Sequence, residues 1–494
     1  MNRPQIGFDL MRLSERMNKF FLKIILGLTG ILLLFLFNPW ILPKGGLLYA
    51  LTYDEEQKLG DQVVREVVGR YQLIRDPMIL GYLNKIGQET LKQAGPQPYP
   101  FRFYLIKDPQ LNAFSVPGGH IFLTTGIVEI MDTEGELASL LGHEIAHVTR
   151  HHISKQMEQQ KKISIATMAA ALLGVLAGDP RIASAVFAGS MATAQTLALK
   201  YSREDEEEAD NYGFKYMTRE GFDPKYMISL FDKLRRWGSF GSEGIPAYML
   251  THPLTGDRMS HVEGLLHRYA EQGPWTRKTS DEFRRFQTIV LTKFGDIQRA
   301  RNRFQSWSSD TQSLLWVHYG QGWLYMREGK YAEAIAQFEK TLSLKPYEAY
   351  LLRDLGEALL LKGDFDQAIG KLSQASILDP QDGNTAYYLA RAYQEKKENQ
   401  LALENYQRAL KLGTEGDNFF YYLGMAYGNL NDLGWAHYYF GKSFLMKGDR
   451  GKAFFHFQTA MRYFGTDPNQ KEMIEREMKI LAPEKLREKK FNSR

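Results

Sequence analysis

The feature that most restricts the fold of this chain is a pattern that recurs every 34 residues in its C-terminal part. The first copy reads Gly322, Tyr325, Gly329, Ala334, Phe338 and Pro346, and the second reads Gly356, Leu359, Gly363, Ala368, Leu372 and Pro380. A unit of this length cannot bury its apolar side chains alone, so successive units must stack on one another. The pattern therefore predicts an elongated array of paired helices.

Two more copies follow with variation. The third keeps Ala390, Tyr393, Ala402, Tyr406 and Ala409, and the fourth keeps Gly424, Tyr427, Ala436 and Phe440. Beyond Gly424 the pattern returns at about half a period, which predicts that one helix there serves two adjacent units. The spacing resembles that of tetratricopeptide repeats, in which small residues let paired helices approach and aromatic residues fill the groove between them. We expect packing roles for these residues, and a curved face that binds peptides or partner proteins.

A second feature lies upstream, in the stretch ASLLGHEIAHVTRHH at residues 138–152. In a helix, His143 and His147 lie one turn plus about 40° apart, so both imidazoles leave the same face. Glu144 projects about 100° to the side of His143, which suits a general base better than a third ligand. This is the division of labour in the His-Glu-x-x-His motif of zinc peptidases. The alternative is a buried helix that is merely rich in histidine.

A zinc site of this kind needs a third protein ligand. A third histidine of the same segment is excluded, because Arg150 and Ile153 stand where the longer motif requires Gly and His. The stretch ALKYSREDEEEADNYGFKYM at residues 198–217 offers carboxylates instead. Ser202 can cap a helix there, and an acidic first turn suits the helix dipole. On its own, such a run is also typical of an ordinary solvated helix start.

The acidic run contains two pairs of carboxylates with helical spacing. Glu206 and Asp210 lie four residues apart and share a face, so one can bind a metal while the other orients a ligand histidine. Glu204 and Glu208 have the same spacing, so the residues alone leave the register open.

Together, HEIAH and SREDEEEAD resemble the zinc peptidases of the HtpX, Oma and CAAX-prenyl-protease type, whose pattern is Ser-Arg-x-x-Glu-x-x-Ala-Asp. The segments LNAFSVPGGHIFLTTGIVE at 111–129 and THPLTGDR at 251–258 are also similar to segments of that family. The resemblance implies one Zn²⁺ per chain, with Glu206 as its third ligand and Asp210 as the acid that supports a ligand histidine. It also implies an α+β peptidase domain of the gluzincin type.

The 111–129 segment carries a strand signal of its own. HIFLTTGIV, residues 120–128, is rich in β-branched and aromatic residues, and the PGG before it marks a turn. In such peptidases an edge strand beside the metal helix can hold a substrate in an extended form through main-chain hydrogen bonds. We expect Asn112, Ala113 and Phe114 to form this substrate strand, with an ordinary core hairpin as the alternative.

Three further histidines lie near these motifs, and their roles also have to be predicted. His252 precedes Pro253 and is either a loop histidine or a group that reaches the metal site, where it could bind zinc, stabilise an oxyanion or regulate the centre. We expect His151 and His152 to be structural or surface residues, because the ligand set is complete without them.

The N-terminal region predicts export. Basic residues precede the apolar run 24–37, as in a signal sequence; they are Arg3, Arg12, Arg16, Lys19 and Lys23. Cleavage after Ala50 would place Leu48 where a small residue is preferred, so an uncleaved membrane anchor is an open alternative. Either way, for a Gram-negative source, the catalytic part is expected in the periplasm.

The apolar segments in 164–199 are too short to span a membrane comfortably, and they favour a buried or lid-forming hairpin over membrane crossings.

Composition narrows the function further. The chain has no cysteine, which excludes disulfides and thiolate metal sites, and its net charge of +5 is spread out rather than clustered. No aromatic and basic motif indicates nucleic-acid binding.

Taken together, the motifs and repeats predict a mainly α protein with five parts: a signal or anchor at 1–50, a zinc peptidase domain at 51–270, a helical connector at 271–312, tetratricopeptide repeats at 313–468 and a charged tail at 469–494.

An exported peptidase of this family joined to such repeats resembles envelope quality-control peptidases. That resemblance implies a dual role, in which the chain degrades unfolded or stalled outer-membrane proteins and assists their assembly, and in which the repeats contact the β-barrel assembly machinery. Two alternatives remain open at this stage. The chain could be a repeat-based chaperone or scaffold with a mostly closed metal site, or a membrane-anchored peptidase acting on membrane proteins.

Overall fold

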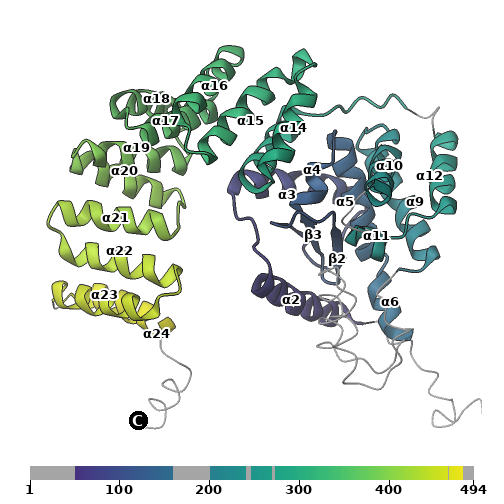
Figure 1. The fold of residues 1–494 in the computed structure, drawn as a ribbon. Coiled ribbons are helices and arrows are strands. Elements are labelled where there is room, and N and C mark those ends of the chain that lie inside the picture. Colours follow the sequence, from purple (N-terminus) through teal and green to yellow (C-terminus); the bar gives the residue numbers. More distant parts are fainter. Residues whose placement is uncertain (1–50, 160–200, 241–245, 270–272, 466, 482–494) are drawn as a thin grey trace, which may run out of the picture.

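The computed structural model describes residues 51–159, 201–240, 246–269, 273–465 and 467–481. Within them the chain is mainly helical and forms an N-terminal unit with a small sheet, followed by a curved array of helices (Figure 1). The apolar N-terminal run and the 164–199 segment lie outside the described residues, so the predictions about them stay predictions. Across the part of the chain that is described, no helix is long and apolar enough to cross a bilayer.

The N-terminal unit is built around three strands in the order β1-β3-β2. β1 (Arg102–Ile106) runs parallel to β3 (His120–Thr124), and β2 (Ala113–Val116) runs antiparallel to β3. The tight turn between β2 and β3 uses Gly118 and Gly119, both at positive φ, which a side chain would disfavour. β2 is therefore an edge strand of this sheet and also one arm of a buried hairpin with β3, so the substrate strand stays a prediction.

The prediction of a strand through residue 128 was wrong. β3 ends at Thr124, and helix α4 (Thr125–Glu129) follows directly. The Thr124 hydroxyl accepts a hydrogen bond from the backbone N–H of Ile127 at 3.4 Å and so caps that helix. Strand propensity at these positions is overridden by this local cap.

Besides α4, the described helices of the N-terminal unit are α2 (Tyr53–Arg70), α3 (Pro77–Lys92), α5 (Glu134–Thr149), α6 (His152–Gln159), α9 (Arg203–Arg219), α10 (Lys225–Phe240), α11 (Ala247–Thr251) and α12 (Gly256–Tyr269). α3 and α5 contact the strands, and α9 and α10 pack against α5. α5 contains the HEIAH motif and is buried over almost its whole length. Its start is fixed by a capping box between Thr133 and Glu136. Ser202 begins α9 with a second capping box, as the sequence predicted.

α5 and α9 cross at a pair of glycines. A Cβ on Gly213 would lie 2.9 Å from the backbone nitrogen of His143, and a Cβ on Gly142 would lie 3.1 Å from the carbonyl oxygen of Gly213. Only residues without a side chain permit this approach of two helix backbones. The crossing brings the carboxylates of α9 to the histidines of α5.

A helical connector leads from the N-terminal unit to the array: α13 (Asp281–Ile289), the π-helical turn η1 (Val290–Phe294) and α14 (Ile297–Trp307). It packs against the segment that precedes α5. The Gln287 amide donates to the carbonyl oxygens of Val128 and Met131, at 3.1 and 2.5 Å, and Arg303 donates to the Met131 carbonyl at 2.6 Å. Arg303 also forms an ion pair with Asp132. The connector thus joins the array to the N-terminal end of the motif helix.

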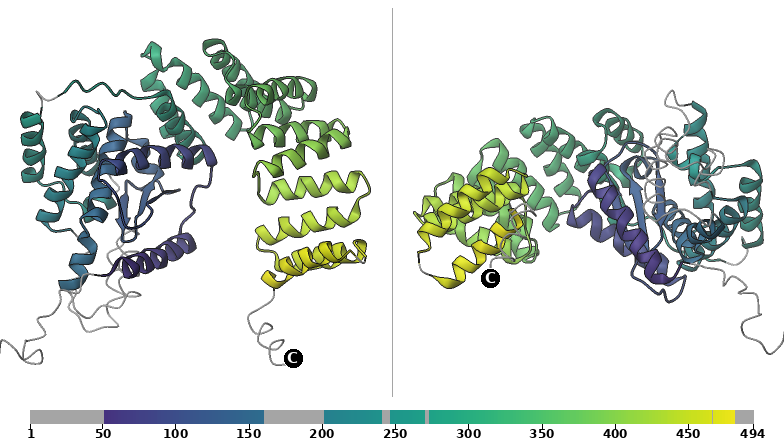
Figure 2. Two further views of the ribbon diagram at one scale, coloured as in Figure 1. Left: turned by 180° about the vertical axis from the view of Figure 1, so that it is seen from behind. Right: turned by 90° about the horizontal axis from the view of Figure 1, so that it is seen from below.

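The array consists of the short turn η2 (Thr311–Ser313) and ten helices: α15 (Leu314–Arg327), α16 (Tyr331–Leu344), α17 (Ala349–Lys362), α18 (Phe365–Leu378), α19 (Gly383–Glu395), α20 (Asn399–Lys411), α21 (Asp417–Asn429), α22 (Leu433–Met446), α23 (Arg450–Tyr463) and α24 (Pro468–Leu481). Successive helices pack in pairs, and the views of Figure 2 show the array curving away from the connector, with α24 at its far end.

The half-period at the end of the array has a clear packing basis. Phe440 of α22 lies against Gly424 of α21, where a Cβ would come within 2.9 Å of the ring. Gly441, the next residue of α22, lies in the same way against Phe457 of α23, at 2.6 Å. α22 therefore packs on both neighbours with the same kind of contact, which confirms that one helix serves two units.

The glycine crossing gives the first testable prediction. Gly213→Ala should destabilise the N-terminal unit by about 1–3 kcal/mol, because the new methyl group overlaps backbone atoms that cannot turn aside. Gly81→Ala is the matched control, because Gly81 is an exposed helical glycine with nothing within 4 Å of an added Cβ; it should stabilise by roughly 0.5–1 kcal/mol. Chemical denaturation of both variants measures the difference. A Gly213→Ala protein as stable as the parent would contradict the close crossing.

Candidate metal centre

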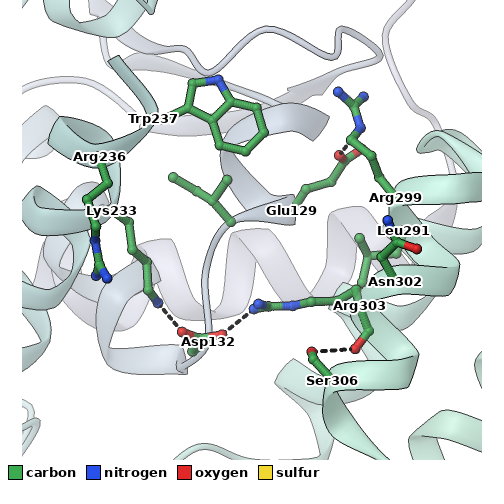
Figure 3. A pocket seen from close by; sticks show the side chains of 11 residues that line it. Glu129, Asp132, Lys233, Arg236, Trp237, Leu291, Arg299, Asn302, Arg303 and Ser306 are labelled. Atoms are coloured by element: carbon green, nitrogen blue, oxygen red, sulfur yellow. Dashed lines mark hydrogen bonds and ion pairs between the residues drawn. The ribbon is translucent and has the colours of Figure 1, made fainter. Parts of the chain in front are cut away.

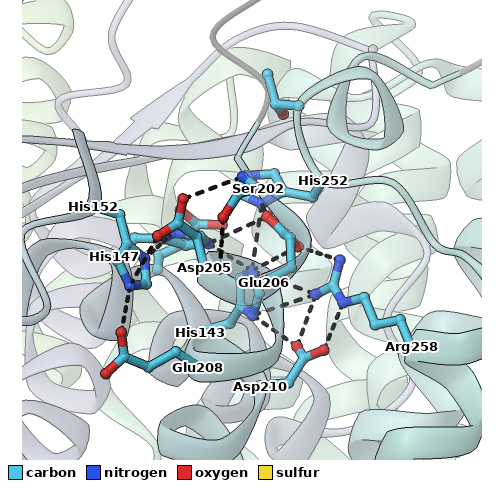
Figure 4. Close-up of polar contacts among 12 residues, drawn as sticks. His143, His147, His152, Ser202, Asp205, Glu206, Glu208, Asp210, His252 and Arg258 are labelled. Carbon is cyan, nitrogen blue, oxygen red and sulfur yellow. Dashed lines mark hydrogen bonds and ion pairs between the residues drawn. The ribbon is translucent and has the colours of Figure 1, made fainter. Parts of the chain in front are cut away.

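Four buried side chains converge where α5 meets α9 and the loop after α11 (Figure 4): His143, His147, Glu206 and His252. Each offers one ligand atom, and these atoms lie within 4.8 Å of one another. The Nε2 atoms of His143 and His147 are 2.9 Å apart. The carboxylate oxygens of Glu206 lie 3.6 Å from Nε2 of His147 and 3.7 Å from Nε2 of His143.

The protonation state of the two histidines on α5 suits metal binding. Burial lowers the pKa of His143 and lowers that of His147 well below its usual value. Both imidazoles are therefore neutral near pH 7, which is the form that binds a metal. Two neutral imidazoles and one carboxylate, all buried and facing one point, form a donor set that fits Zn²⁺.

Asp210 lies directly behind His143. Its Oδ1 atom is 3.0 Å from Nδ1 of His143, so that nitrogen donates to the carboxylate and Nε2 keeps its lone pair for the centre. The structure thus brings Asp210 to the place that the resemblance implied. Glu204 and Glu208, the alternative pair, lie elsewhere: Glu204 is exposed, and Glu208 pairs with Arg150 at 2.7 Å.

Arg258, from α12, is a site residue for which sequence reasoning gave no role. Its guanidinium contacts Asp210 at 2.5 and 2.7 Å and also forms an ion pair with Glu206. Burial alone would raise the pKa of Asp210, but the positive charge of Arg258 and its hydrogen bonds hold this pKa at about 2. A fully buried carboxylate therefore stays ionised and can orient His143. The signal was present in the sequence, since Arg258 ends the THPLTGDR segment.

His152 is the second residue whose contact was missed. Its Nδ1 atom lies 2.8 Å from Nδ1 of His147, and its Nε2 atom lies 3.0 Å from a Glu208 oxygen. His152 is thus a buried structural residue behind the centre and not a member of the ligand cluster. His151 turns away from the centre and contacts Glu56 at 2.8 Å.

Glu144 lies beside the cluster and faces His252, one of its four members. Oε1 of Glu144 lies 3.6 Å from Nε2 of His252, and among the described residues neither atom has a hydrogen-bond partner. Burial, with the nearby charge of Glu206, raises the pKa of Glu144 to about 8. The carboxyl is poised to take or give a proton near neutral pH. A buried polar pair without partners is the arrangement expected where a ligand and its water complete the site.

Two tyrosine rings hold the imidazoles in place. Tyr201 stacks on His147 with ring centroids 3.7 Å apart, and Tyr248 stacks on His252 with centroids 4.5 Å apart. Nδ1 of His252 also lies 2.8 Å from Oε1 of Glu206. His252 thus reaches the site, which is one of the two outcomes left open by the sequence.

The edge strand β2 packs against α5, next to the centre. The Asn112 carbonyl accepts the N–H of Thr124 at 3.1 Å, so the alternation of an antiparallel ladder turns the backbone groups of Ala113 and Ser115 to the outer edge. Phe114 pairs with Phe122 toward β3. Ala113 and Ser115 are buried in this structure, so these main-chain donors and acceptors would reach another extended chain only when the edge is uncovered.

Comparison with known families agrees with this geometry. Residues 80–266 match the model of peptidase family M48, and residues 319–383 match a tetratricopeptide repeat model. Residues 80–266 are therefore a peptidase family M48 domain, joined in one chain to tetratricopeptide repeats. The predicted fold class, a mainly helical chain with an α+β peptidase domain and an all-α repeat array, is confirmed.

Several curated proteins are similar over part of their length. The beta-barrel assembly-enhancing protease of Escherichia coli (strain K12) is 29% identical over 307 residues, which cover 61% of this chain and 62% of that protein. A putative beta-barrel assembly-enhancing protease of Vibrio cholerae is 36% identical over 44% of this chain and 46% of its own. The metalloprotease LoiP of Escherichia coli is 26% identical over 43% of this chain and 81% of its own. The chain thus spans less than two thirds of the first two relatives.

The contact between Asp210 and His143 gives the second prediction. Asp210→Ala should weaken zinc binding roughly 10- to 100-fold, because His143 loses the group that fixes its tautomer and Arg258 loses one of its two carboxylate partners. Glu207→Ala is the matched control, since Glu207 is exposed on the same helix. Competition with a chromogenic chelator measures both affinities, and circular dichroism checks the fold. Equal affinities in the two variants would show that Asp210 does not support the centre.

Proposed function

We propose that this chain is an exported zinc-dependent endopeptidase. His143 and His147 from α5 and Glu206 from α9 would hold the Zn²⁺, and Glu144 would be the catalytic residue. The observation that carries the proposal is the convergence of these buried groups across the glycine crossing of α5 and α9. When bound, zinc would polarise the peptide carbonyl and lower the pKa of water.

Each residue at the centre has a step that follows from its position. Glu144 takes the proton of the attacking water on its carboxylate and passes it to the nitrogen of the leaving amine. Between the two steps, the Glu144 carboxyl holds this proton until the amine accepts it. Nε2 of His252 faces Glu144. Because Nδ1 of this ring donates to Glu206, Nε2 is an acceptor while the imidazole is neutral, and His252 would stabilise an oxyanion only as the imidazolium.

The substrate strand is the second part of the proposal. Asn112, Ala113 and Phe114 would form the strand that holds a peptide in an extended form, with main-chain hydrogen bonds supplied by the outward-facing groups of Ala113 and the neighbouring Ser115. Because such bonds ignore side-chain identity, this grip suits an enzyme that cuts many unfolded chains.

Location and clients rest on the N-terminal pattern and on the relatives. Basic residues followed by the apolar run 24–37 support export to the periplasm, with the segment either cleaved or kept as an inner-membrane anchor. Two relatives are named beta-barrel assembly-enhancing proteases. We therefore propose that this chain degrades misfolded or stalled outer-membrane proteins, and that its repeats bind these clients or the β-barrel assembly machinery.

Burial of the ligand cluster favours one second candidate. All four side chains of the cluster are almost inaccessible, which supports a chaperone or scaffold role of the repeats with a mostly closed centre. One variant distinguishes the two functions. A chain without the Glu144 carboxylate would lose peptide cleavage, but it would still assist assembly if the repeats act alone.

The third prediction concerns Glu144. Glu144→Gln should keep one zinc per chain and the native fold, because Glu144 is outside the ligand cluster, yet lose most casein cleavage because the general base is gone. Chelation of zinc from the parent protein should abolish cleavage to the same degree, and added zinc should restore it. Zinc content by mass spectrometry and casein turnover are measured together. Unchanged turnover in Glu144→Gln would refute the assignment.

The fourth prediction tests the strand edge without altering the protein. A substrate peptide N-methylated at alternate residues near its cleavage site loses the donors that pair with an edge strand, so its kcat/KM should fall by roughly tenfold or more. The control is the same peptide methylated at the intervening residues, whose N–H groups point away from the strand. Equal losses for the two patterns would contradict a grip by β2.

A further inference from the structure

A cavity of about 780 Å³ lies outside the metal centre, between the N-terminal unit and the connector (Figure 3). One wall comes from α10 and from residues 129–132, which precede α5. The opposite wall comes from η1 and α14. The volume lies in the range of small-ligand sites, and no role in the proposed chemistry accounts for it.

Positive charge dominates the lining. Four cationic side chains face two carboxylates, Glu129 and Asp132. Asp132 is already matched on both sides, by Lys233 and by Arg303 (Figure 3). Glu129 faces Arg299 at 3.3 Å, and burial raises the pKa of this carboxyl to about 7, so it is only partly ionised at neutral pH. Lys233 also pairs with Glu136 outside the lining, so the excess positive charge of the cavity rests on Arg236 and in part on Arg299.

Arg236 is the cation best placed to meet a ligand. It is exposed on α10, and no carboxylate among the described residues forms an ion pair with it. Its Nε donates to the carbonyl of Asp232 at 3.3 Å, which leaves the two Nη groups for another acceptor. The indole of Trp237, the next residue, is 36% exposed, and Figure 3 shows it over the cavity with Leu291 on the far side.

The remaining lining decides the kind of ligand. Asn302 and Ser306 of α14 add an amide and a hydroxyl, which suit the polar groups of a peptide backbone. The apolar lining is limited to Ile130, Trp237 and Leu291, too little to cover the acyl chains of a lipid. A planar guanidinium beside an indole suits a carboxylate with a large apolar side chain next to it.

We propose that this cavity binds a carboxylate of an extended polypeptide, held by Arg236, with the adjacent apolar side chain against Trp237 and Leu291. The carboxylate belongs either to the C-terminus of the bound chain or to an Asp or Glu side chain. The inference rests on the proposed function only in taking a polypeptide as the ligand. An occupant would bridge α10 and α14 beside Asp132, one residue before the cap of α5, and so connect binding to the helix that carries the metal ligands.

Binding is tested on the full chain with Glu144→Gln, and mass spectrometry of the peptides after each titration checks that they are intact, so that a failed catalytic proposal is detected separately from failed binding. Three labelled peptides ending in Phe are compared by fluorescence anisotropy: a free acid, its amide, and an amide with Glu beside the Phe. The free acid should bind roughly tenfold or more tightly than the plain amide. Tight binding of the third peptide assigns the site to side-chain carboxylates, and weak binding assigns it to chain termini.

Variants then locate the site. Arg236→Gln should reduce free-acid binding to the level of the amide, and Trp237→Ala should weaken all three peptides. Arg235→Gln is the matched control: this neighbour on the same helix pairs with Asp232 and does not line the cavity, so its variant should bind like the parent. Equal binding of free acid and plain amide, or unchanged binding in Arg236→Gln, would overturn the proposal.

Discussion

The contact on which the centre depends is the crossing of α5 and α9 at Gly142 and Gly213. With a side chain at Gly213, the two backbones would have to separate, since a Cβ there would lie 2.9 Å from the His143 nitrogen. Glu206 and Asp210 lie on the face of α9 that this approach presents to His143 and His147. Each helix places its polar side chains on one face, and these two faces meet in a cluster only because the two glycines allow the helices to come close.

Charge balance is the second condition that the site must meet. Burying Glu206 and Asp210 would be costly without a partner, and Arg258 supplies one positive charge to both. The same guanidinium keeps Asp210 ionised, and Asp210 in turn orients His143. Zinc would add the remaining positive charge among His143, His147 and Glu206. The centre is therefore a network in which one buried arginine supports a ligand from behind.

Residue spacing predicted much of this arrangement. The positions of His143, Glu144 and His147 follow from helical periodicity, and the repeat array follows from its 34-residue pattern. The choice of Glu206 over Glu204 did not follow from spacing, because both registers share the same four-residue interval and only the crossing with α5 separates them. Arg258 could not be placed, because its contact with Asp210 joins segments far apart in sequence. His152 could not be placed, because its contact with His147 depends on the bend between α5 and α6 and not on helical spacing. The strand predicted through residue 128 failed because Thr124 caps a helix.

The connector attaches the repeat array to the N-terminal unit. Gln287 and Arg303 donate hydrogen bonds to carbonyl oxygens of the segment that precedes α5. The helices leading into the repeats are therefore attached to the start of α5, the helix that carries the HEIAH motif. The cavity beside Asp132 lies at this same junction. The arrangement suits a protein in which the repeats engage a chain and the peptidase domain cuts it.

The measurement that tests the central claim most directly is metal content by mass spectrometry on the purified parent chain and on Glu206→Gln, with Glu204→Gln as the control on the same helix. The account predicts one zinc per chain in the parent and in Glu204→Gln, and loss of zinc and casein cleavage together in Glu206→Gln. Zinc retained in Glu206→Gln would move the third ligand to His252 or another carboxylate, and a parent chain without zinc would contradict the peptidase assignment.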